Sequence, residues 1–303
     1  MTRALEGRRI VVTGSSEGIG RAVALHLAGE GARVVVNASG LGSGGVAAAE
    51  DRLAGLVAEV ADRGGEGLAC VASVAELAGA EAIVGRAVDG FGGLDGLVNC
   101  AGIAGAPANS LCEIEVEDWR RVVSTHLDGT FFCCRAAVPH LIAAGGGAIV
   151  NTSSHGFLGG FGGSAYPAAK GAINSLSFAI AADLASDRIR CNAVCPGAKT
   201  RLSTGTAYEA VIGRLEQRGL LDAEGVAASL NAPPAEGCAP LYGYLLSDHA
   251  SHITGRLFSA AGGYVGVFAR AEERAIGLRE EGDGTWTIDA LADAVAKNLE
   301  GSP

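Results

Sequence analysis

The sequence lacks an uninterrupted apolar run of about 18 residues, the length that a membrane-spanning helix requires. Its most apolar window, 131–150, is interrupted by Arg135, Pro139 and His140. The N-terminal segment MTRALEGRRIVVTG lacks the apolar core of a secretory signal peptide and leads directly into a strand-like run. These absences argue against a membrane partner, and we expect a cytoplasmic protein.

An excess of basic residues is also missing. The chain carries a net charge of −10 at pH 7 and has an isoelectric point near 5.1, which argues against nucleic acid as a partner. None of the eight cysteines forms a CxxC pair, and several lie within apolar patterns. We therefore expect buried thiols rather than a metal site.

Strand-like and helix-like segments alternate along the chain. This order is typical of a parallel sheet that helices cover on both faces, so the predicted fold class is α/β. The expected strands are 8–13, 33–37, 67–71, 94–99, 148–152, 189–194 and 256–259. The expected helices are 18–29, 46–62, 76–90, 116–143 and 164–186, with a bend near Pro139 in the fourth, because proline has no N–H to donate.

The domain organisation predicted from the sequence is simple. Apolar residues make up 49% of the chain, which supplies a sizeable core, and no internal repeat or low-complexity linker divides it. We predict a single domain over 1–303. It carries an insertion at about 201–240 and a C-terminal extension at about 264–303, with a short helix near 289–299.

Tyr166 and Lys170 are four residues apart in the segment Tyr-Pro-Ala-Ala-Lys. On a helix this spacing places both side chains on the same face. A free tyrosine titrates near ~10, and a neighbouring ammonium lowers that pKa and tunes the phenol for acid–base work. The motif is weak alone, since many such pairs are solvated helix surface.

The glycine-rich segment Thr13-Gly-Ser-Ser-Glu-Gly-Ile-Gly20 lies between an expected strand and an expected helix. Gly14 permits a tight turn, Gly18 lets a pyrophosphate approach the backbone, and Gly20 allows close packing of helix on strand. The helix N-terminus offers free N–H groups and a positive dipole end to phosphate. The segment therefore predicts a dinucleotide-binding turn, and a plain glycine-rich turn is the alternative.

With Asn99-Cys-Ala-Gly102 and Ser153-Ser154, these motifs resemble the short-chain dehydrogenase/reductase family over roughly residues 8–263. The resemblance implies a doubly wound Rossmann fold of about seven strands, an NAD(P) cofactor, a homotetramer, and hydride exchange between a secondary alcohol and a ketone. It implies that Tyr166 is the acid–base and that Lys170 binds the nicotinamide ribose. The other implied cofactor-binding residues are Gly14, Ser16, Ile19, Gly20, Asn99, Ala101, Gly102, Pro196, Gly197 and Thr200.

The substrate-orienting serine is ambiguous between two neighbours. The family's usual spacing of thirteen residues before the tyrosine selects Ser153. Strand register selects Ser154 instead, with one residue lost just after it, because Gly156, Gly159 and Tyr166 keep the family's intervals. Adjacent residues on a strand point to opposite faces, so only one serine can serve. We favour Ser154.

His126 departs from the family pattern, because it stands where a helical asparagine is usual. That asparagine is thought to hold a water that feeds a proton relay through the lysine. A neutral histidine can also donate and accept a hydrogen bond, so we expect His126 to take part in catalysis. The alternative is a histidine that only bonds a backbone carbonyl.

The end of the second strand bears on the choice between NAD and NADP. Asn37 and Ser39 are expected to line the ribose, and Ala38 stands where an acid normally repels a 2′-phosphate. Ala72 likewise replaces an aspartate that usually meets the adenine. Glu17, however, occupies a position where NADP users often carry a base. The signals conflict, and we favour NADP.

The stretches 37–40, 65–76 and 260–286, together with His126, resemble one subgroup most closely. It comprises the (3R)-hydroxyacyl-CoA dehydrogenase domain of peroxisomal multifunctional enzyme type 2 and its bacterial relatives. This points to acyl thioesters as small-molecule substrates, with steroids or cyclic alcohols as the alternative. The alternatives from other functional classes are a non-catalytic NAD(P)-binding sensor and a structural subunit.

Overall fold

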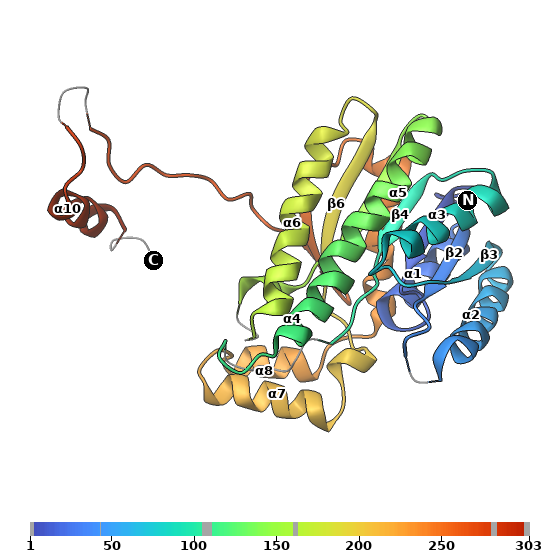
Figure 1. Ribbon diagram of the computed structural model, residues 1–303, viewed down its shortest axis with the longest axis horizontal. Coiled ribbons are helices and arrows are strands. Elements are labelled where there is room, and N and C mark those ends of the chain that lie inside the picture. The colour runs from blue at the N-terminus through green and yellow to red at the C-terminus, as the bar shows by residue number, and fades with distance from the viewer. Residues whose placement is uncertain (1–2, 43, 105–110, 160–162, 280–283, 300–303) are drawn as a thin grey trace. The chain divides into compact units, whose positions relative to one another are not determined.

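One sheet organises the computed structural model, which describes residues 3–42, 44–104, 111–159, 163–279 and 284–299. In this part of the chain eight strands follow the order β3-β2-β1-β4-β5-β6-β7-β8 (Figure 1). Strands β1 to β7 pair in parallel, and β8 is antiparallel to β7. The strands are β1 Arg9–Thr13, β2 Arg33–Ala38, β3 Glu66–Val71, β4 Gly96–Asn99, β5 Gly147–Thr152, β6 Ile189–Pro196, β7 Leu257–Ala261 and β8 Tyr264–Val267.

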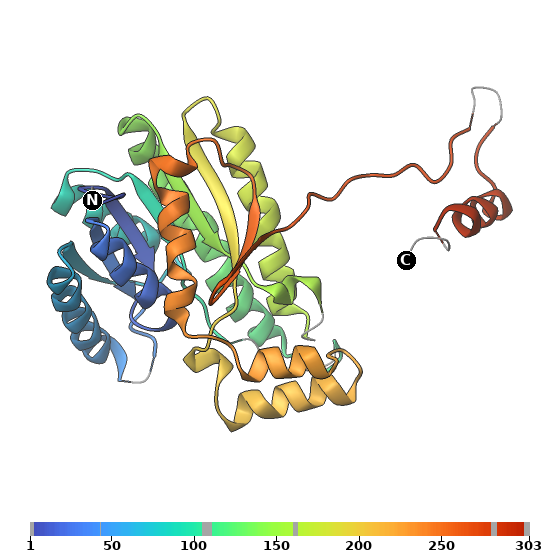
Figure 2. The same cartoon turned by 180° about the vertical axis from the view of Figure 1, so that it is seen from behind.

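The sheet has a hydrophobic core on each face, because helices cover both faces and side chains alternate between them along the strands. Ile10 and Val12 of β1 belong to the core on one face, and Val11 belongs to the core on the other. The predicted doubly wound fold is confirmed. The first face is covered by α1 (Gly18–Gly29), α2 (Gly45–Asp62) and α9 (Ala239–Leu246), seen in Figure 2, and the second by α3 (Leu77–Phe91), α5 (Gly129–Ala143) and α6 (Ala165–Asp183), seen in Figure 1.

Strand β8 is absent from the sequence prediction of about seven strands. It follows a turn at Gly262, whose φ is +56°. Tyr264, Val265 and Val267 are all exposed. A short edge strand without a buried face leaves no alternating apolar pattern, so the sequence does not separate it from a loop.

The helix predicted over 116–143 contains a change of hydrogen-bond pattern. It consists of α4 (Val116–Val123), a π-helical turn (Ser124–Asp128) and α5, which includes Pro139. The π-helical turn contains His126, which is buried. Such turns are rare and frequently occur at functional sites. The turn therefore draws attention to His126 independently of the sequence motif.

Two compact units divide the chain, Met1–Phe268 and Ala269–Pro303. In the first unit, the segment predicted as an insertion contains α7 (Thr206–Gln217) and α8 (Ala223–Leu230). In the second unit, α10 (Ile288–Leu299) forms where the sequence predicts a short helix. The sheet and every residue discussed below as part of the site belong to the first unit.

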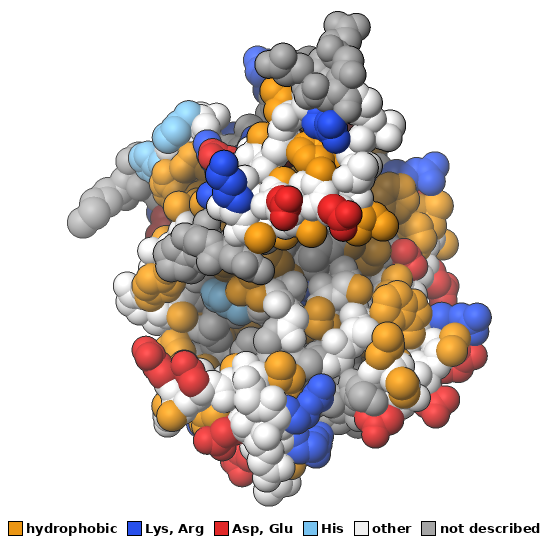
Figure 3. Space-filling model, turned by 90° about the vertical axis from the view of Figure 1, so that its left-hand side faces the viewer, with side chains coloured by type: hydrophobic (Ala, Val, Ile, Leu, Met, Phe, Trp, Pro, Cys, Tyr) orange, Lys and Arg blue, Asp and Glu red, His pale blue; other side chains and the backbone are white. Residues whose placement is uncertain are grey.

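The helices, the surface charges and the cysteines bear on the membrane, nucleic-acid and metal partners that the composition argues against. Within the described residues, no helix is long and apolar enough to cross a membrane, and no three His, Cys, Asp or Glu side chains could together hold a metal ion. On the face shown in Figure 3, Lys and Arg lie among acidic and hydrophobic side chains rather than in a basic stripe. Five of the eight free cysteines are buried, Cys70 and Cys100 are half-buried, and Cys112 is exposed.

Candidate active site

The phenol of Tyr166 meets the hydroxyl of Ser154 where β5 leads towards α6. Their side chains are hydrogen-bonded, and Ser154 Oγ also accepts the backbone N–H of Gly156 at 3.1 Å. A Cβ on Gly156 would lie 3.1 Å from Tyr166 Cε1 and 3.3 Å from Ser154 Oγ, so a glycine keeps this contact open. The serine that faces the phenol is therefore Ser154.

Ser153 faces the opposite side of the chain. Its side chain is 2% exposed, and its Oγ donates to the backbone carbonyl of Lys170 at 3.4 Å. It also hydrogen-bonds Cys195 of β6. These contacts place Ser153 inside the protein, as the alternation of adjacent strand residues requires.

Lys170 is an almost fully buried cation. Its side chain is 4% exposed, and Nζ donates to the backbone carbonyl of Thr152, the last residue of β5, at 2.7 Å. Nζ lies 5.7 Å from the centre of the Tyr166 ring. Burial lowers the pKa of Lys170 to about 8, so most of the lysine remains charged at pH 7.

The expectation of a lowered tyrosine pKa is wrong for this arrangement. Burial raises the pKa of Tyr166 above its ordinary value, and the hydrogen bond with Ser154 acts in the opposite direction. Desolvation penalises the charged phenolate more than its surroundings stabilise it. At neutral pH Tyr166 is therefore a protonated phenol.

His126 lies between the Tyr166 ring and the segment that follows strand β4. Its ring stands edge-on to that of Tyr166 at 5.2 Å between centres. Nε2 lies 3.1 Å from the backbone N and 2.9 Å from the backbone O of Ile103, so it accepts or donates according to the tautomer. Nδ1 is buried and has no hydrogen-bond partner among the described residues.

The charge state of His126 is set by its surroundings. Burial, together with a smaller effect of the Lys170 charge, lowers the pKa of His126 to about 3. A Cβ on Gly102 would lie 2.6 Å from His126 Cε1, so Gly102 makes room for the imidazole. The imidazole is thus a neutral group packed against the backbone of residues 102 and 103.

The glycine turn has the geometry that its sequence predicts. Gly14 has a φ of +61°, and a Cβ there would lie 2.5 Å from Ala101 Cα. A Cβ on Gly20 would lie 2.5 Å from the Gly14 carbonyl oxygen. Gly18, with a φ of +58°, begins α1 and faces the methyl of Thr200. The α1 N-terminus therefore stays accessible at backbone level, which fits a pyrophosphate.

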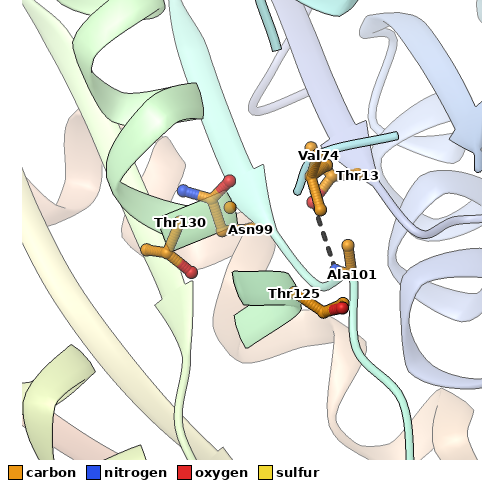
Figure 4. Close-up of a pocket in the computed structure, with 7 residues that line it drawn as sticks. Thr13, Val74, Asn99, Ala101, Thr125 and Thr130 are labelled. Carbon is orange, nitrogen blue, oxygen red and sulfur yellow. Dashed lines mark hydrogen bonds between the residues drawn. The ribbon is translucent and has the colours of Figure 1, made fainter. Parts of the chain in front are cut away.

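Thr13 and Asn99 hold the neighbouring strand ends together. Thr13 Oγ1 accepts the backbone N–H group of Cys100 at 3.1 Å and that of Ala101 at 3.2 Å, and Figure 4 shows the second of these bonds. Asn99 Nδ2 donates to Asn151 Oδ1 of β5 at 2.9 Å. The side chain of Asn99 thus points along the sheet, and Figure 4 shows it beside a small pocket that Thr13 and Ala101 also line.

Comparison with known proteins identifies the family. The family model for short chain dehydrogenases matches residues 8–208. A 3beta-hydroxysteroid dehydrogenase of Mediterraneibacter gnavus is 37% identical over 84% of this chain and 94% of its own length. A 3-oxoacyl-[acyl-carrier-protein] reductase of Staphylococcus aureus is 34% identical over 84% of this chain and 96% of its own length. A crystal structure of a short chain dehydrogenase from Mycobacterium avium has a TM-score of 0.78 and 35% identity, covering 99% of this chain and 97% of its own.

The chain belongs to the short-chain dehydrogenase family. Members of this family bind NAD or NADP, and this one is an NAD(P)-dependent oxidoreductase that interconverts secondary alcohols and ketones. The turn at Gly14–Gly20, in which neither Gly14 nor Gly20 has room for a Cβ, fits the dinucleotide of this family.

Asn37 differs in placement from the sequence interpretation. Its side chain is 1% exposed, its Oδ1 accepts the Gly14 N–H at 3.1 Å, and its Nδ2 donates to the carbonyls of Cys70 and Ala72 at 3.1 and 3.0 Å. Through these bonds the Asn37 amide supports the glycine turn. Ser39 is exposed, and its Oγ accepts the N–H of Leu41.

The remaining predicted contacts lie in the turn and after β6. Ser16 and Ile19 are half-buried around the start of α1, Pro196 ends β6, and Gly197 follows it. The Thr200 hydroxyl lies 3.2 Å from that of Ser203. Sequence reasoning missed Thr152, the carbonyl partner of Lys170, and Arg201, which pairs with Glu17. The position of Thr152 directly before the serine pair was the available signal for the first.

His126 should remain neutral in the folded enzyme. Because the folded pKa is near 3 and that of an unfolded histidine is about 6.5, the unfolded state binds more protons between these values. The contribution of His126 to stability is therefore complete above about pH 6.5 and is lost as the pH falls towards 3. Histidine NMR should show no titration of this ring above about pH 5, and His126→Asn should flatten the acid side of the stability profile. A midpoint between about pH 5 and 8 for His126 would contradict the assigned burial.

Proposed function

We propose that Tyr166 and Ser154 bind the substrate oxygen and that the phenol of Tyr166 transfers the proton. The observation that carries this proposal is the hydrogen bond between the two side chains beside the fixed ammonium of Lys170. A substrate carbonyl or hydroxyl that replaces this mutual hydrogen bond meets two donors at one oxygen. Such positioning is the principal contribution that a protein makes to hydride chemistry.

Lys170 has an electrostatic role in the proposal. When a ketone is reduced, Tyr166 gives up its proton and becomes a phenolate, whose formation burial opposes. The ammonium 5.7 Å from the ring centre offsets that cost, and the Thr152 carbonyl prevents it from moving away. In the oxidation direction Tyr166 must first release its own proton to solvent, and the same charge favours the phenolate that then accepts the alcohol proton.

The dinucleotide site is proposed on the residues around the glycine turn. Gly14, Ser16, Ile19 and Gly20 present the α1 N-terminus to the pyrophosphate. Bound nicotinamide supplies or accepts the hydride. The other residues proposed to line this site are Ser39, Asn99, Ala101, Gly102, Pro196, Gly197, Thr200, Tyr166 and Lys170, whereas Asn37 is proposed to hold the turn.

NADP remains the favoured dinucleotide in this proposal. Ala38 is buried at the end of β2 and leaves no carboxylate to repel a 2′-phosphate, and Ser39 beside it is exposed. The carboxylate of Glu17 is paired with Arg201, which offsets the nearby negative charge that argues for NAD.

His126 is proposed as a neutral positioning group, because its Nε2 hydrogen-bonds the Ile103 backbone.

Two substrate classes are proposed for the enzyme. The resemblance to the (3R)-hydroxyacyl-CoA dehydrogenase domain and the match to a 3-oxoacyl reductase support a 3-hydroxyacyl thioester. The match to a 3beta-hydroxysteroid dehydrogenase supports a cyclic secondary alcohol as the second candidate. The homotetramer and the cytoplasmic location stay predictions of the sequence.

A substrate panel tests the activity directly. We expect 3-hydroxyacyl thioesters, hydroxysteroids or cyclic alcohols to produce nicotinamide absorbance, with higher kcat/KM for NADP than for NAD. Tyr166→Phe should lower turnover by about 10²- to 10⁴-fold and still bind the dinucleotide, because only the transferable proton is removed. Dinucleotide binding without turnover on any substrate would favour the sensor interpretation. A large preference for NAD would overturn the cofactor proposal alone.

The two serines form a matched pair for a second test. Ser154→Ala removes a hydroxyl that contacts Tyr166, whereas Ser153→Ala removes one that contacts the Lys170 carbonyl. We expect Ser154→Ala to lower kcat by about 10²-fold, the scale of a lost donor to the reacting oxygen, and Ser153→Ala to lower kcat by less. Circular dichroism and thermal melting of both variants check the fold. The reverse order of kcat values would show that Ser153 is the substrate-orienting residue.

A further inference from the structure

An ion pair joins the glycine turn to the segment after β6. Arg201 Nε lies 2.9 and 3.1 Å from the two carboxylate oxygens of Glu17, and Nη2 lies 2.5 Å from one of them. The two residues are 184 positions apart in the sequence. This two-pronged geometry is the strongest arrangement available to an arginine and a carboxylate.

The segment that carries Arg201 is held at its other side. Lys199 N donates to the Pro233 carbonyl at 2.7 Å. Thr200 and Ser203 form a capping box, in which Thr200 N donates to Ser203 Oγ at 2.8 Å. We call residues 199–203 the strap. These bonds hold the backbone of the strap on the protein, and Arg201 reaches across to Glu17 of the glycine turn.

A cavity lies between the start of α1 and the strap. The cavity is lined on one side by Gly18, Arg21 and Ala22 of α1, and on the other by the strap and residues 234–236. The methyl of Thr200 faces Gly18, at 3.5 Å from the place of a Cβ there. The strap therefore lies against Gly18, within the turn where the proposed function places the pyrophosphate.

We propose that the Glu17–Arg201 ion pair fastens the strap over the bound dinucleotide and must open for the dinucleotide to leave. The inference rests on the proposed function, since it needs the pyrophosphate at Gly14–Gly20. The pair is partly exposed, with side-chain accessibilities of 49% for Glu17 and 72% for Arg201, so it can open and close without disturbing the core. An exposed ion pair is weak, which suits a fastening that must open in each turnover.

The direction in which Glu17→Gln changes the rate of dinucleotide release separates this role from a simple charge effect. Glu17 is a negative charge beside the proposed pyrophosphate, so its neutralisation alone would strengthen dinucleotide binding and slow release. Loss of the fastening would instead speed release. Glu17→Gln therefore has opposite effects under the two accounts.

Stopped-flow fluorescence of the reduced dinucleotide measures the release rate. We expect Glu17→Gln and Arg201→Gln each to speed release by about two- to five-fold at low salt, the range for an exposed ion pair. In the Arg201→Gln background, Glu17→Gln should give no further increase. Added salt should speed release more in the wild type than in the double variant, because salt screens the pair.

Glu66→Gln is the matched control. It breaks another exposed pair, Arg33–Glu66 at 2.6 Å, at the opposite end of the strands, so it removes the same charge without touching the strap. We expect it to leave the release rate unchanged. Slower or unchanged release in Glu17→Gln, or an equal increase in Glu66→Gln, would overturn the strap and leave the proposed function standing.

Amide hydrogen exchange gives a readout that needs no dinucleotide. Glu17→Gln should raise exchange over residues 199–203 relative to the wild type and to Glu66→Gln, and equal exchange in all three would count against the strap. Failure of both dinucleotides to bind the wild type would overturn the proposed function and the strap together.

Discussion

A single buried ammonium sets the conditions for the rest of the site. Lys170 is 4% exposed, and its Nζ donates a hydrogen bond to the Thr152 carbonyl. Removing a charge from water is costly unless a polar partner compensates it. The strand end supplies that partner and thereby fixes the cation near the Tyr166 ring. Lowering of the lysine pKa to about 8 is the residual cost of this burial.

The sheet and the missing Cβ atoms explain why this arrangement is possible. Parallel strands bring Thr13, Asn99 and Asn151 into the same register at their carboxyl ends. Close approaches that only a glycine allows then let Gly14 lie against Ala101 and let Gly102 lie against His126. Ligands bind at such strand ends in open α/β sheets, where the connections diverge. The glycine turn follows β1 at this edge, and the last residue of β5 binds Lys170 there, so the two proposed sites are built on the same edge of the sheet.

Much of the fold could be predicted from the sequence, because its signals are local. The buried β-branched strands and the helix at Gly18–Gly29 follow from patterns within short windows. Strand β8 could not be predicted, since an exposed edge strand has no such pattern. The π-helical turn at Ser124–Asp128 could not be predicted either, because the pattern of the helix around it is continuous in the sequence.

For the candidate site too, the sequence predicts what a local motif encodes and not what depends on the surroundings of a side chain. The motif identified Tyr166 and Lys170, and strand register pointed to Ser154 as the residue facing the phenol, which is where the structure places it. The direction of the Tyr166 pKa depends on total burial, which spacing along the chain does not report. Asn37 was interpreted as a ribose contact because it ends a strand. Its three internal hydrogen bonds are visible only once β1, β2 and β3 are assembled.

Lys170→Met offers the most direct test of the central claim, because it removes the charge and keeps much of the side-chain volume. The measurement is the single-turnover rate of deuterium transfer from nicotinamide C4 to the carbinol carbon of the product. The account predicts a fall of about 10²-fold or more, with the free energy of unfolding unchanged or raised because no buried charge remains. An undiminished transfer rate in a folded Lys170→Met enzyme would contradict it.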